Sequence, residues 1–412
     1  MKRRGLRITT ASALATMLTA GTLIGVLSGP SPAQAAGSST GGLPVVSGSL
    51  SNPGPTPAAA APSAAKARFT TLPYANAPSR GALDQTSLAA TTIATWSLSV
   101  VAGQNGLTYP FTVIGADPRT GVSKTLKVLE IPMNITFAGT GDNYNPTTST
   151  CGQPISPAAG LLAGPDFKST GSSTGDPTVG SSQYTDKLMR ESFWHVPSFN
   201  SLYHVKLKGS EPVGYNVTVT GFPEIAGGTC SALGEIDVNT WDSFIRTSVI
   251  PALHSFGVNS TDFPVFLVKN VVFYSGSTSN CCILGYHSAF NSPASGGHAQ
   301  TYGIADWDTS GEFGSGVADN SVASHEIGEW AMDPYVNNAT PSWGHIGQVS
   351  GCQSNLEVGD PLSGTNRSAI LGGIKYHVQE LALFGWFFDY NAGSDGYYSM
   401  KDTFKTGATL CS

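Results

Sequence analysis

The sequence has few charged residues, and this scarcity limits the partners that the protein can bind. Charged residues make up 12% of the 412 residues, against about 25% in typical soluble domains. The net charge is −6, and no cluster of Lys and Arg follows the N-terminal segment. Because phosphate binding needs clustered cations, we expect no nucleic-acid partner. A weakly charged sequence rich in Gly, Ser and Thr is typical of an extracellular, β-rich protein.

Several catalytic motifs are also absent. The sequence contains no G-x-S-x-G element, P-loop or dinucleotide fingerprint, so serine-hydrolase and nucleotide chemistry have no motif support. No two cysteines have the C-x-x-C spacing of a zinc knuckle. No segment after the N-terminal one is apolar enough to span a membrane, so we expect no membrane association once that segment is removed.

The first 35 residues have the organisation of a secretory signal. A basic start precedes a mostly apolar stretch from residue 11 to 27, and Ala33-Gln34-Ala35 supplies the small residues that a signal peptidase needs. A retained membrane helix is the alternative, but the stretch is shorter than the ~20 apolar residues of a span. We therefore expect a secreted bacterial protein without residues 1–35.

Three further regions are predicted after the signal segment. Residues 36–82 are expected to be a disordered linker rich in Gly, Ser, Pro and Ala, because they have too few large apolar side chains to offset their ordering entropy. Whether the linker is a propeptide is left open. A β-rich N-terminal region is predicted over residues 83–200 and a metal-binding domain over residues 201–412. The oligomeric state is not determined by the sequence.

Six cysteines follow the signal segment, an even number that favours disulfides in an exported protein. A bond between Cys352 and Cys411 would tie the C-terminus to the region of the metal-binding motif described below. We expect the adjacent Cys281 and Cys282 to have separate partners, because a bond between neighbours would be strained. The remaining two are Cys151 and Cys230.

Apolar periodicity predicts the secondary structure, and its order in the second half is strand, helix, three strands, helix. The last helix begins at Asp319, Asn320 or Ser321 and ends at Asp333-Pro334. Strands are predicted at 96–101, 109–114, 128–137, 217–220, 263–274, 283–290 and 299–305, and the earlier helices at 183–194 and 238–256.

The last helix carries the motif His325-Glu326-Ile-Gly-Glu329. His325 and Glu329 are four residues apart, so their side chains lie on one helix face and can reach one ion at about 2.0–2.2 Å. Glu326 has the position of the general base that activates the metal's water in H-E-x-x-H zinc hydrolases. Glu329 replaces the second His, and its charge would make the ion a weaker Lewis acid. The alternative is a solvated helix whose N-terminal Glu is favoured by the helix dipole.

A stable metal site needs a third protein ligand. The acidic turn Glu357-Val-Gly-Asp360 lies downstream, and we expect Glu357 or Asp360 to be this ligand, with Asp360 slightly favoured. His345 and Asp333 are reserve candidates.

Three more residues are weaker candidates. His287 lies on the strand pair before the motif helix and could line a substrate groove, although a strand residue with a satisfied imidazole is favoured. Asp306 and Asp308 could bind calcium together with backbone carbonyls, although an acidic loop without an ion is favoured.

Four short motifs follow one another in the chain: Gln183-Tyr-Thr-Asp-x-x-x-Arg190-x-x-Phe-Trp194, Gly285-Tyr-His287, His325-Glu-x-x-Glu329-x-x-x-Asp-Pro334 and Glu357-Val-Gly-Asp360. Together they resemble a family of exported bacterial proteins related to zincin metallopeptidases. The resemblance covers roughly residues 95–390, and it implies an α+β, zincin-like fold: a mixed sheet with an active-site helix, preceded by a β-rich region. It does not imply a substrate.

The expected function is that of a secreted zinc-dependent hydrolase, endopeptidase-like, acting on a peptide or protein. The alternative from another class is a non-catalytic extracellular binding or surface protein with a structural metal. A glycosidase is the third and weakest hypothesis, because Glu326 and Glu329 on one short helix are badly placed to flank a sugar bond.

Overall fold

The computed structural model describes residues 43–61, 66–72, 91–149, 152–226 and 230–412. The predicted signal segment and residues 36–42, 62–65 and 73–82 of the predicted linker lie outside this part of the chain. Contacts group the described residues into one compact unit. No helix among the described residues is long and apolar enough to span a membrane.

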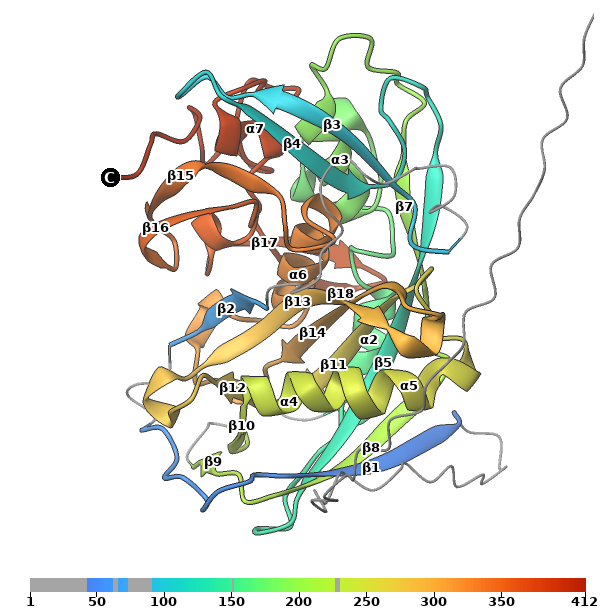
Figure 1. The fold of residues 1–412 in the computed structure, drawn as a ribbon, viewed down its shortest axis with the longest axis vertical. Helices are drawn as coiled ribbons and strands as arrows, with labels where there is room; N and C mark the ends of the chain where they lie inside the picture. Colours follow the sequence, from blue (N-terminus) through green and yellow to red (C-terminus); the bar gives the residue numbers. More distant parts are fainter. Residues whose placement is uncertain (1–42, 62–65, 73–90, 150–151, 227–229) are drawn as a thin grey trace, which may run out of the picture. The chain divides into compact units, whose positions relative to one another are not determined.

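Twelve strands of the described residues form one mixed sheet (Figure 1). Every neighbouring pair from β1 to β14 is parallel, whereas β13 is antiparallel to both β14 and β12. The predicted mixed sheet with helices is confirmed, and the fold is mixed α/β. The main order is β1 (Val45–Ser51), β8 (Gly214–Thr220), β5 (Lys124–Phe137), β11 (Phe263–Lys269), β14 (His298–Trp307), β13 (Ile283–Ser292), β12 (Val271–Tyr274), β10 (Leu233–Asp237) and β9 (Glu224–Ile225).

Three further strands pair beside this main order. β2 (Arg68–Thr71) pairs with β13, while β6 (Asn143–Tyr144) and β7 (Val205–Ser210) pair with β5. The N-terminal half of the chain thus adds strands to the same sheet as the C-terminal half.

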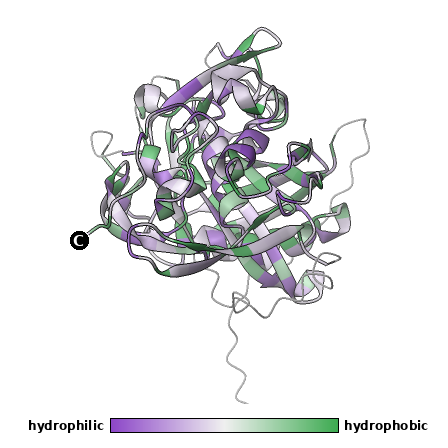
Figure 2. Cartoon of the chain, turned by 90° about the horizontal axis from the view of Figure 1, so that it is seen from above, coloured by the Kyte–Doolittle hydropathy of each residue, from purple (hydrophilic) through white to green (hydrophobic). Residues whose placement is uncertain are grey.

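The two faces of the sheet are both buried, and β11 shows why. Its sequence is apolar almost throughout, which is typical of a strand covered on both sides. Successive side chains point to opposite faces, so that Val265 and Leu267 belong to one hydrophobic cluster and Phe266 and Val268 to the other. In Figure 2 the hydrophobic residues concentrate in the central strands and helices.

Helices cover the two faces separately (Figure 1). On one face lie α4 (Val238–Phe244) and α5 (Ile250–Leu253), which belong to the cluster of Phe266. On the other lie α3 (Tyr184–Phe193), α6 (Ser321–Met332) and α7 (Phe384–Phe388). A short helix, α2 (Pro157–Ala163), contacts β5 and β11.

The predicted helix over 238–256 consists of α4, a π-helical turn at Ile245–Val249, α5 and a final 3-10 turn at His254–Phe256. Pro251 does not end it: the proline directly follows the π-helical turn, and the helix continues to Leu253.

The predicted strand over 263–274 is in fact two strands, β11 and β12. Asn270 separates them with a φ of +52°, a conformation that Asn adopts more readily than most residues. Its side-chain oxygen accepts a hydrogen bond from the backbone N–H of Thr309 at 2.6 Å. As a result the chain leaves β11 and re-enters the sheet on the far side of β14 and β13.

The structure differs from the prediction of a disordered linker over residues 36–82, because β1 and β2 lie within it. β1 pairs along its whole length with β8, and β2 pairs with β13. Composition predicts whether a segment can form its own core, but a strand that joins an existing sheet needs mainly its backbone hydrogen bonds. Small residues even help here, since a Cβ at Gly48 would lie 2.4 Å from the Tyr215 hydroxyl.

Three hairpins complete the described fold, and two of them contact α6, the first and the last in the chain. They are β3 (Thr95–Val101) with β4 (Thr108–Ile114), β15 (Ala339–Ile346) with β16 (Val349–Asn355), and β17 (Asn366–Leu371) with β18 (Ile374–Gln379). The predicted strands at 96–101, 109–114 and 128–137 correspond to β3, β4 and β5, and the predicted helix at 183–194 corresponds to α3.

The cysteine predictions have mixed outcomes. The disulfide between Cys352 and Cys411 is confirmed, and it joins β16 to the C-terminus. The prediction of separate partners for Cys281 and Cys282 is wrong, because these two are bonded to each other. The cis peptide bond between them brings their Cα atoms to 3.0 Å, a spacing that a trans peptide does not allow.

Candidate metal centre

Helix α6 brings the predicted metal-binding motif into the interior of the protein. It packs on β13 and β14, and all of its residues are buried. Asn320 is its N-cap, and it ends at Asp333, as predicted. The Asp333 carboxylate accepts hydrogen bonds from the backbone N–H groups of Asn337 at 2.8 Å and Asn338 at 3.0 Å. The side chain of the C-cap residue therefore fixes the turn that follows the motif helix.

Three predicted ligands converge on one point. The Nε2 atom of His325 lies 3.0 Å from Oε1 of Glu329 and 3.6 Å from Oδ1 of Asp360, and the ligand atoms of all three lie within 4.8 Å of one another. A tetrahedral ion with bonds near 2.05 Å spaces its ligand atoms about 3.3 Å apart. The two separations that involve His325 are close to this spacing.

The acidic turn after β16 supplies Asp360. This residue begins a short 3-10 turn at Asp360–Leu362, and its Oδ2 accepts a hydrogen bond from Gln353 Nε2 at 3.1 Å. Glu357 lies next to Glu329 rather than in the convergent group, and Asn355 Nδ2 donates to its Oε1 at 3.2 Å. Of the two acidic candidates, the structure brings Asp360 to His325.

The two reserve candidates do not join the group. Asp333 is engaged in the turn that follows α6. His345 is exposed on β15, beside the disulfide between Cys352 and Cys411.

Glu326 lies beside the convergent group with an unsatisfied carboxylate. Neither of its side-chain oxygens has a hydrogen-bond partner in the described part of the chain, although both are buried. Its Oε2 lies 3.5 Å from Nδ1 of His287, which also lies 3.7 Å from Oε2 of Glu329. These three residues form a second set of groups able to hold an ion.

His287 is more closely involved in the site than the sequence indicated. Its Nε2 lies 3.2 Å from the backbone oxygen of Asp333. Because a carbonyl only accepts, Nε2 carries the proton and Nδ1 presents a lone pair. That lone pair faces the carboxylates of Glu326 and Glu329, so a proton or a cation is needed between them. The motif Gly285-Tyr-His287 was the one signal in the sequence for this role.

The electrostatics of the site oppose charge in the absence of a cation. Burial raises the pKa values of Glu326, Glu329 and Glu357 well above their usual range, and neighbouring carboxylates add to the effect. Burial also raises the pKa of Asp360 to about 6. For the imidazoles it acts in the other direction, lowering the pKa of His325 to about 4 and that of His287 to about 3.

The residues present fit a divalent cation. Unpaired buried carboxylates are costly, and the two nitrogens of His325 also lack a hydrogen-bond partner in the described chain. A cation would compensate the carboxylates and accept the imidazole lone pair at once. One imidazole and two carboxylates are donors that several divalent cations accept, zinc among them.

Two glycines make room for the side chains of the site. A Cβ at Gly359 would lie 2.4 Å from Nδ1 of His325, and a Cβ at Gly285 would lie 2.8 Å from Oε1 of Glu326. The Gly359 N–H also donates to Oε1 of Glu329 at 3.0 Å. The glycines of the two short motifs are therefore explained by close approach of the backbone to the site.

Two further residues, which no sequence pattern indicated, also contact the site. The ring of Phe69, on β2, stacks on the ring of His325, and the side chain of Gln348 donates to Asp360. Phe69 lies within the predicted linker, and Gln348 lies in the turn between β15 and β16, so neither carried a recognisable pattern.

The predicted calcium ligands are not brought together with a third group. Asp306 accepts a hydrogen bond from the backbone N–H of Val271 at 3.3 Å, and Asp308 accepts one from that of Ser310 at 3.1 Å. Neither belongs to a convergent set of ligands among the described residues.

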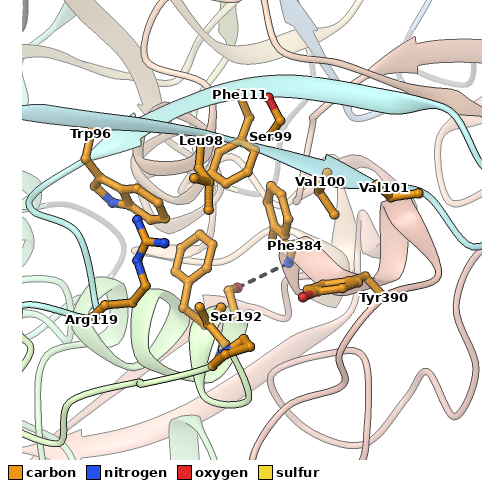
Figure 3. A pocket seen from close by; sticks show the side chains of 13 residues that line it. Trp96, Leu98, Ser99, Val100, Val101, Phe111, Arg119, Ser192, Phe384 and Tyr390 are labelled. Carbon is orange, nitrogen blue, oxygen red and sulfur yellow. Dashed lines mark hydrogen bonds between the residues drawn. The ribbon is translucent and has the colours of Figure 1, made fainter.

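A separate cavity of about 290 Å³ lies between the β3–β4 hairpin, α3 and α7 (Figure 3). Its walls are mostly apolar, with Trp96, Phe111 and Phe384 facing its interior and Arg119 at one side. No candidate metal ligand lines it, so it is not part of the metal centre.

Comparisons with protein-family models, with curated proteins and with solved structures find no match to this chain.

Proposed function

We propose that the protein is a secreted zinc-dependent hydrolase, endopeptidase-like, in which His325, Glu329 and Asp360 hold the ion and Glu326 acts as general base. The observation that carries the proposal is the convergence of three ligand atoms within 4.8 Å beside a buried carboxylate with no hydrogen-bond partner in the described chain. A purely structural helix has no need for such an unsatisfied cluster.

The fold arrangement supports the same proposal. We interpret α6 as the active-site helix of a zincin-like fold, with β11, β13 and β14 as the strands that precede it. This interpretation is supported by the packing of α6 on β13 and β14 and by a third ligand that follows the helix in the chain.

Each side chain has a distinct task in this mechanism. A zinc ion held there would supply Lewis acidity and a nucleophile at neutral pH. Glu326 takes a proton from the attacking water. This role needs an ionised carboxylate, which the charge of a cation bound beside it would favour. His287 positions Glu326, because its Nδ1 lies 3.5 Å from Oε2 and can accept a hydrogen bond once the carboxyl is protonated.

The proposal is tested by metal content and hydrolysis in the wild type, Glu326→Gln and Glu329→Ala. We expect zinc in the wild type and in Glu326→Gln, and its loss in Glu329→Ala because a ligand is removed. Cleavage of casein or a peptide library should fall in Glu326→Gln by on the order of 10²–10⁴-fold, the usual contribution of a general base. Equal cleavage by Glu326→Gln, or a wild type that binds no zinc, would refute the mechanism.

The alternative function, an extracellular binding protein with a structural metal, is favoured by one observation. His325 has no exposed surface, and Glu326 is 1% exposed, so the described conformation gives a substrate no path to the base. Zinc binding without cleavage in a form whose site is open would establish this alternative.

A further inference from the structure

A short N-terminal segment, residues 66–72, lies against the closed site, and we call it the strap. The strap contains β2 and lies parallel to β13, pairing with residues from Ile283 to His287. Its backbone pairing begins at Lys66, whose carbonyl accepts a hydrogen bond from Cys282 N–H at 3.0 Å. At the other end, the carbonyl of Leu72 accepts one from Ser288 Oγ at 2.7 Å. The strap thus lies along the strand that carries His287.

One side chain of the strap covers a candidate ligand directly. The ring of Phe69 stacks on that of His325 with centroids 3.7 Å apart and planes within 12°. This separation is ordinary van der Waals contact, so no water or substrate atom fits between the rings. Phe69 is itself 8% exposed, whereas His325 is not exposed at all. The aromatic ring therefore separates one face of the imidazole from solvent.

The outer edge of the strap is connected to a second candidate ligand. Gln348 Oε1 accepts a hydrogen bond from Phe69 N–H at 2.7 Å, and Gln348 Nε2 donates to the Phe69 carbonyl at 3.0 Å. The same Nε2 also donates to Oδ1 of Asp360. The strap thus contacts His325 through the ring of Phe69, and it is linked to Asp360 through the side-chain amide of Gln348.

We infer that the strap is an autoinhibitory segment, which closes the metal centre and must leave β13 before a polypeptide substrate can reach Glu326. The part of this inference that concerns substrate rests on the proposed function. An extended polypeptide could use the same strand edge, since main-chain pairing with a sheet edge is a general mode of peptide binding. The strap occupies that edge from within the same chain, at a high effective concentration.

The strap is built to be released without unfolding the protein. Phe69 is the one buried side chain among those of the strap whose placement is described, and its neighbours are intermediate or exposed. A segment with few buried apolar contacts opens locally at lower free energy than the core. By contrast, α6 and β11 are buried throughout.

The first test compares the full-length wild type with Phe69→Ala after loading with zinc. We measure the rate at which zinc passes to a chelator and the rate of peptide hydrolysis. Opening should be more frequent without the ring, so both rates should rise by roughly tenfold. Phe290→Ala is the matched control, because this phenylalanine lies on β13 and packs on the opposite cluster. Unchanged zinc release in Phe69→Ala would overturn the inference.

A second measurement does not depend on zinc or activity. Hydrogen–deuterium exchange of the wild type should show faster exchange for the strap amides than for those of α6 and β11. Strap amides that exchange only at the rate of global unfolding would contradict local release.

If Phe69→Ala releases zinc faster but cleaves nothing, closure of the site by the strap is supported and the hydrolase proposal fails. If exchange and zinc release show no opening while Glu326→Gln abolishes cleavage, the strap inference fails and the hydrolase proposal stands.

Discussion

The ligands of the candidate metal centre are held by groups that do not themselves offer a ligand atom. Gly359 donates its N–H to Glu329, and Gln353 donates to Asp360. Such contacts orient the ligands, and their loss commonly lowers metal affinity by about 10–100-fold. At the scale of single residues, therefore, the site depends on close backbone approach as well as on its acidic side chains.

Gly359→Ala tests this dependence. The added methyl group would lie 2.4 Å from Nδ1 of His325, so the imidazole or the acidic turn must move. We expect zinc affinity to fall by about 10–100-fold, measured by competition with a chromophoric chelator. Gly351→Ala is the control, because nothing lies within 4 Å of its added Cβ. Equal zinc affinity in Gly359→Ala and the wild type would mean that the turn does not constrain His325.

At the scale of elements, α6 is positioned by its C-terminal end as well as by its packing. Asp333 caps the helix and organises the turn that leads to β15. The backbone carbonyl of the same residue fixes the ring of His287 on β13. One residue thus links the motif helix, the following hairpin and the strand below.

Asp333→Ala should destabilise the fold. The substitution leaves the buried N–H of Asn338 without this carboxylate partner, a loss that costs about 1–3 kcal/mol. The free energy of unfolding in urea measures it. Asp117→Ala provides the comparison, because it also removes a carboxylate that accepts a backbone hydrogen bond, but from a partly exposed ion pair with Arg119. We expect a change below about 1 kcal/mol there; similar losses in both variants would argue against a special role for Asp333.

At the scale of the whole molecule, the buried acidic cluster links stability to pH and metal. Raised pKa values mean that the folded, metal-free protein retains protons that the unfolded chain has lost. Its free energy of unfolding should therefore fall as pH rises above the ordinary carboxyl pKa of about 4.5. Above about pH 6.5 this fall is due to the three glutamates, because Asp360 has lost its proton by then. Below about pH 6.5 the lowered pKa values of His325 and His287 act in the opposite direction, so they raise the free energy of unfolding as pH rises. Above about pH 6.5 both imidazoles are neutral in the folded and in the unfolded chain, and they add no further pH dependence.

The measurement is urea unfolding of metal-free protein across this pH range. Glu326→Gln should show a shallower slope, by at most about 1.4 kcal/mol per pH unit, because one titrating carboxyl is removed. Saturating zinc should flatten the wild-type dependence, since a cation stabilises the ionised carboxylates. Identical slopes in the metal-free wild type and Glu326→Gln would show that Glu326 is already ionised in the folded state.

The sequence by itself determined the elements whose pattern is local. The spacing in His325-Glu326-Ile-Gly-Glu329 determines which side chains share a helix face, and the limits of α6 follow from its flanking residues. Periodicity likewise located β3, β4, β5 and α3, because alternation and helical spacing are read over a few neighbouring residues.

Only the tertiary structure decided the relations between distant segments. In the folded chain Asp360, and not Glu357, lies close to His325. The Nδ1 atom of His287 faces Glu326, and Phe69 of the predicted linker stacks on His325. These relations depend on strand order and on pairing between residues far apart in the chain, for which no local period exists. The motif thus follows from the sequence, whereas the third ligand and the closure of the site follow from how the sheet brings remote segments together.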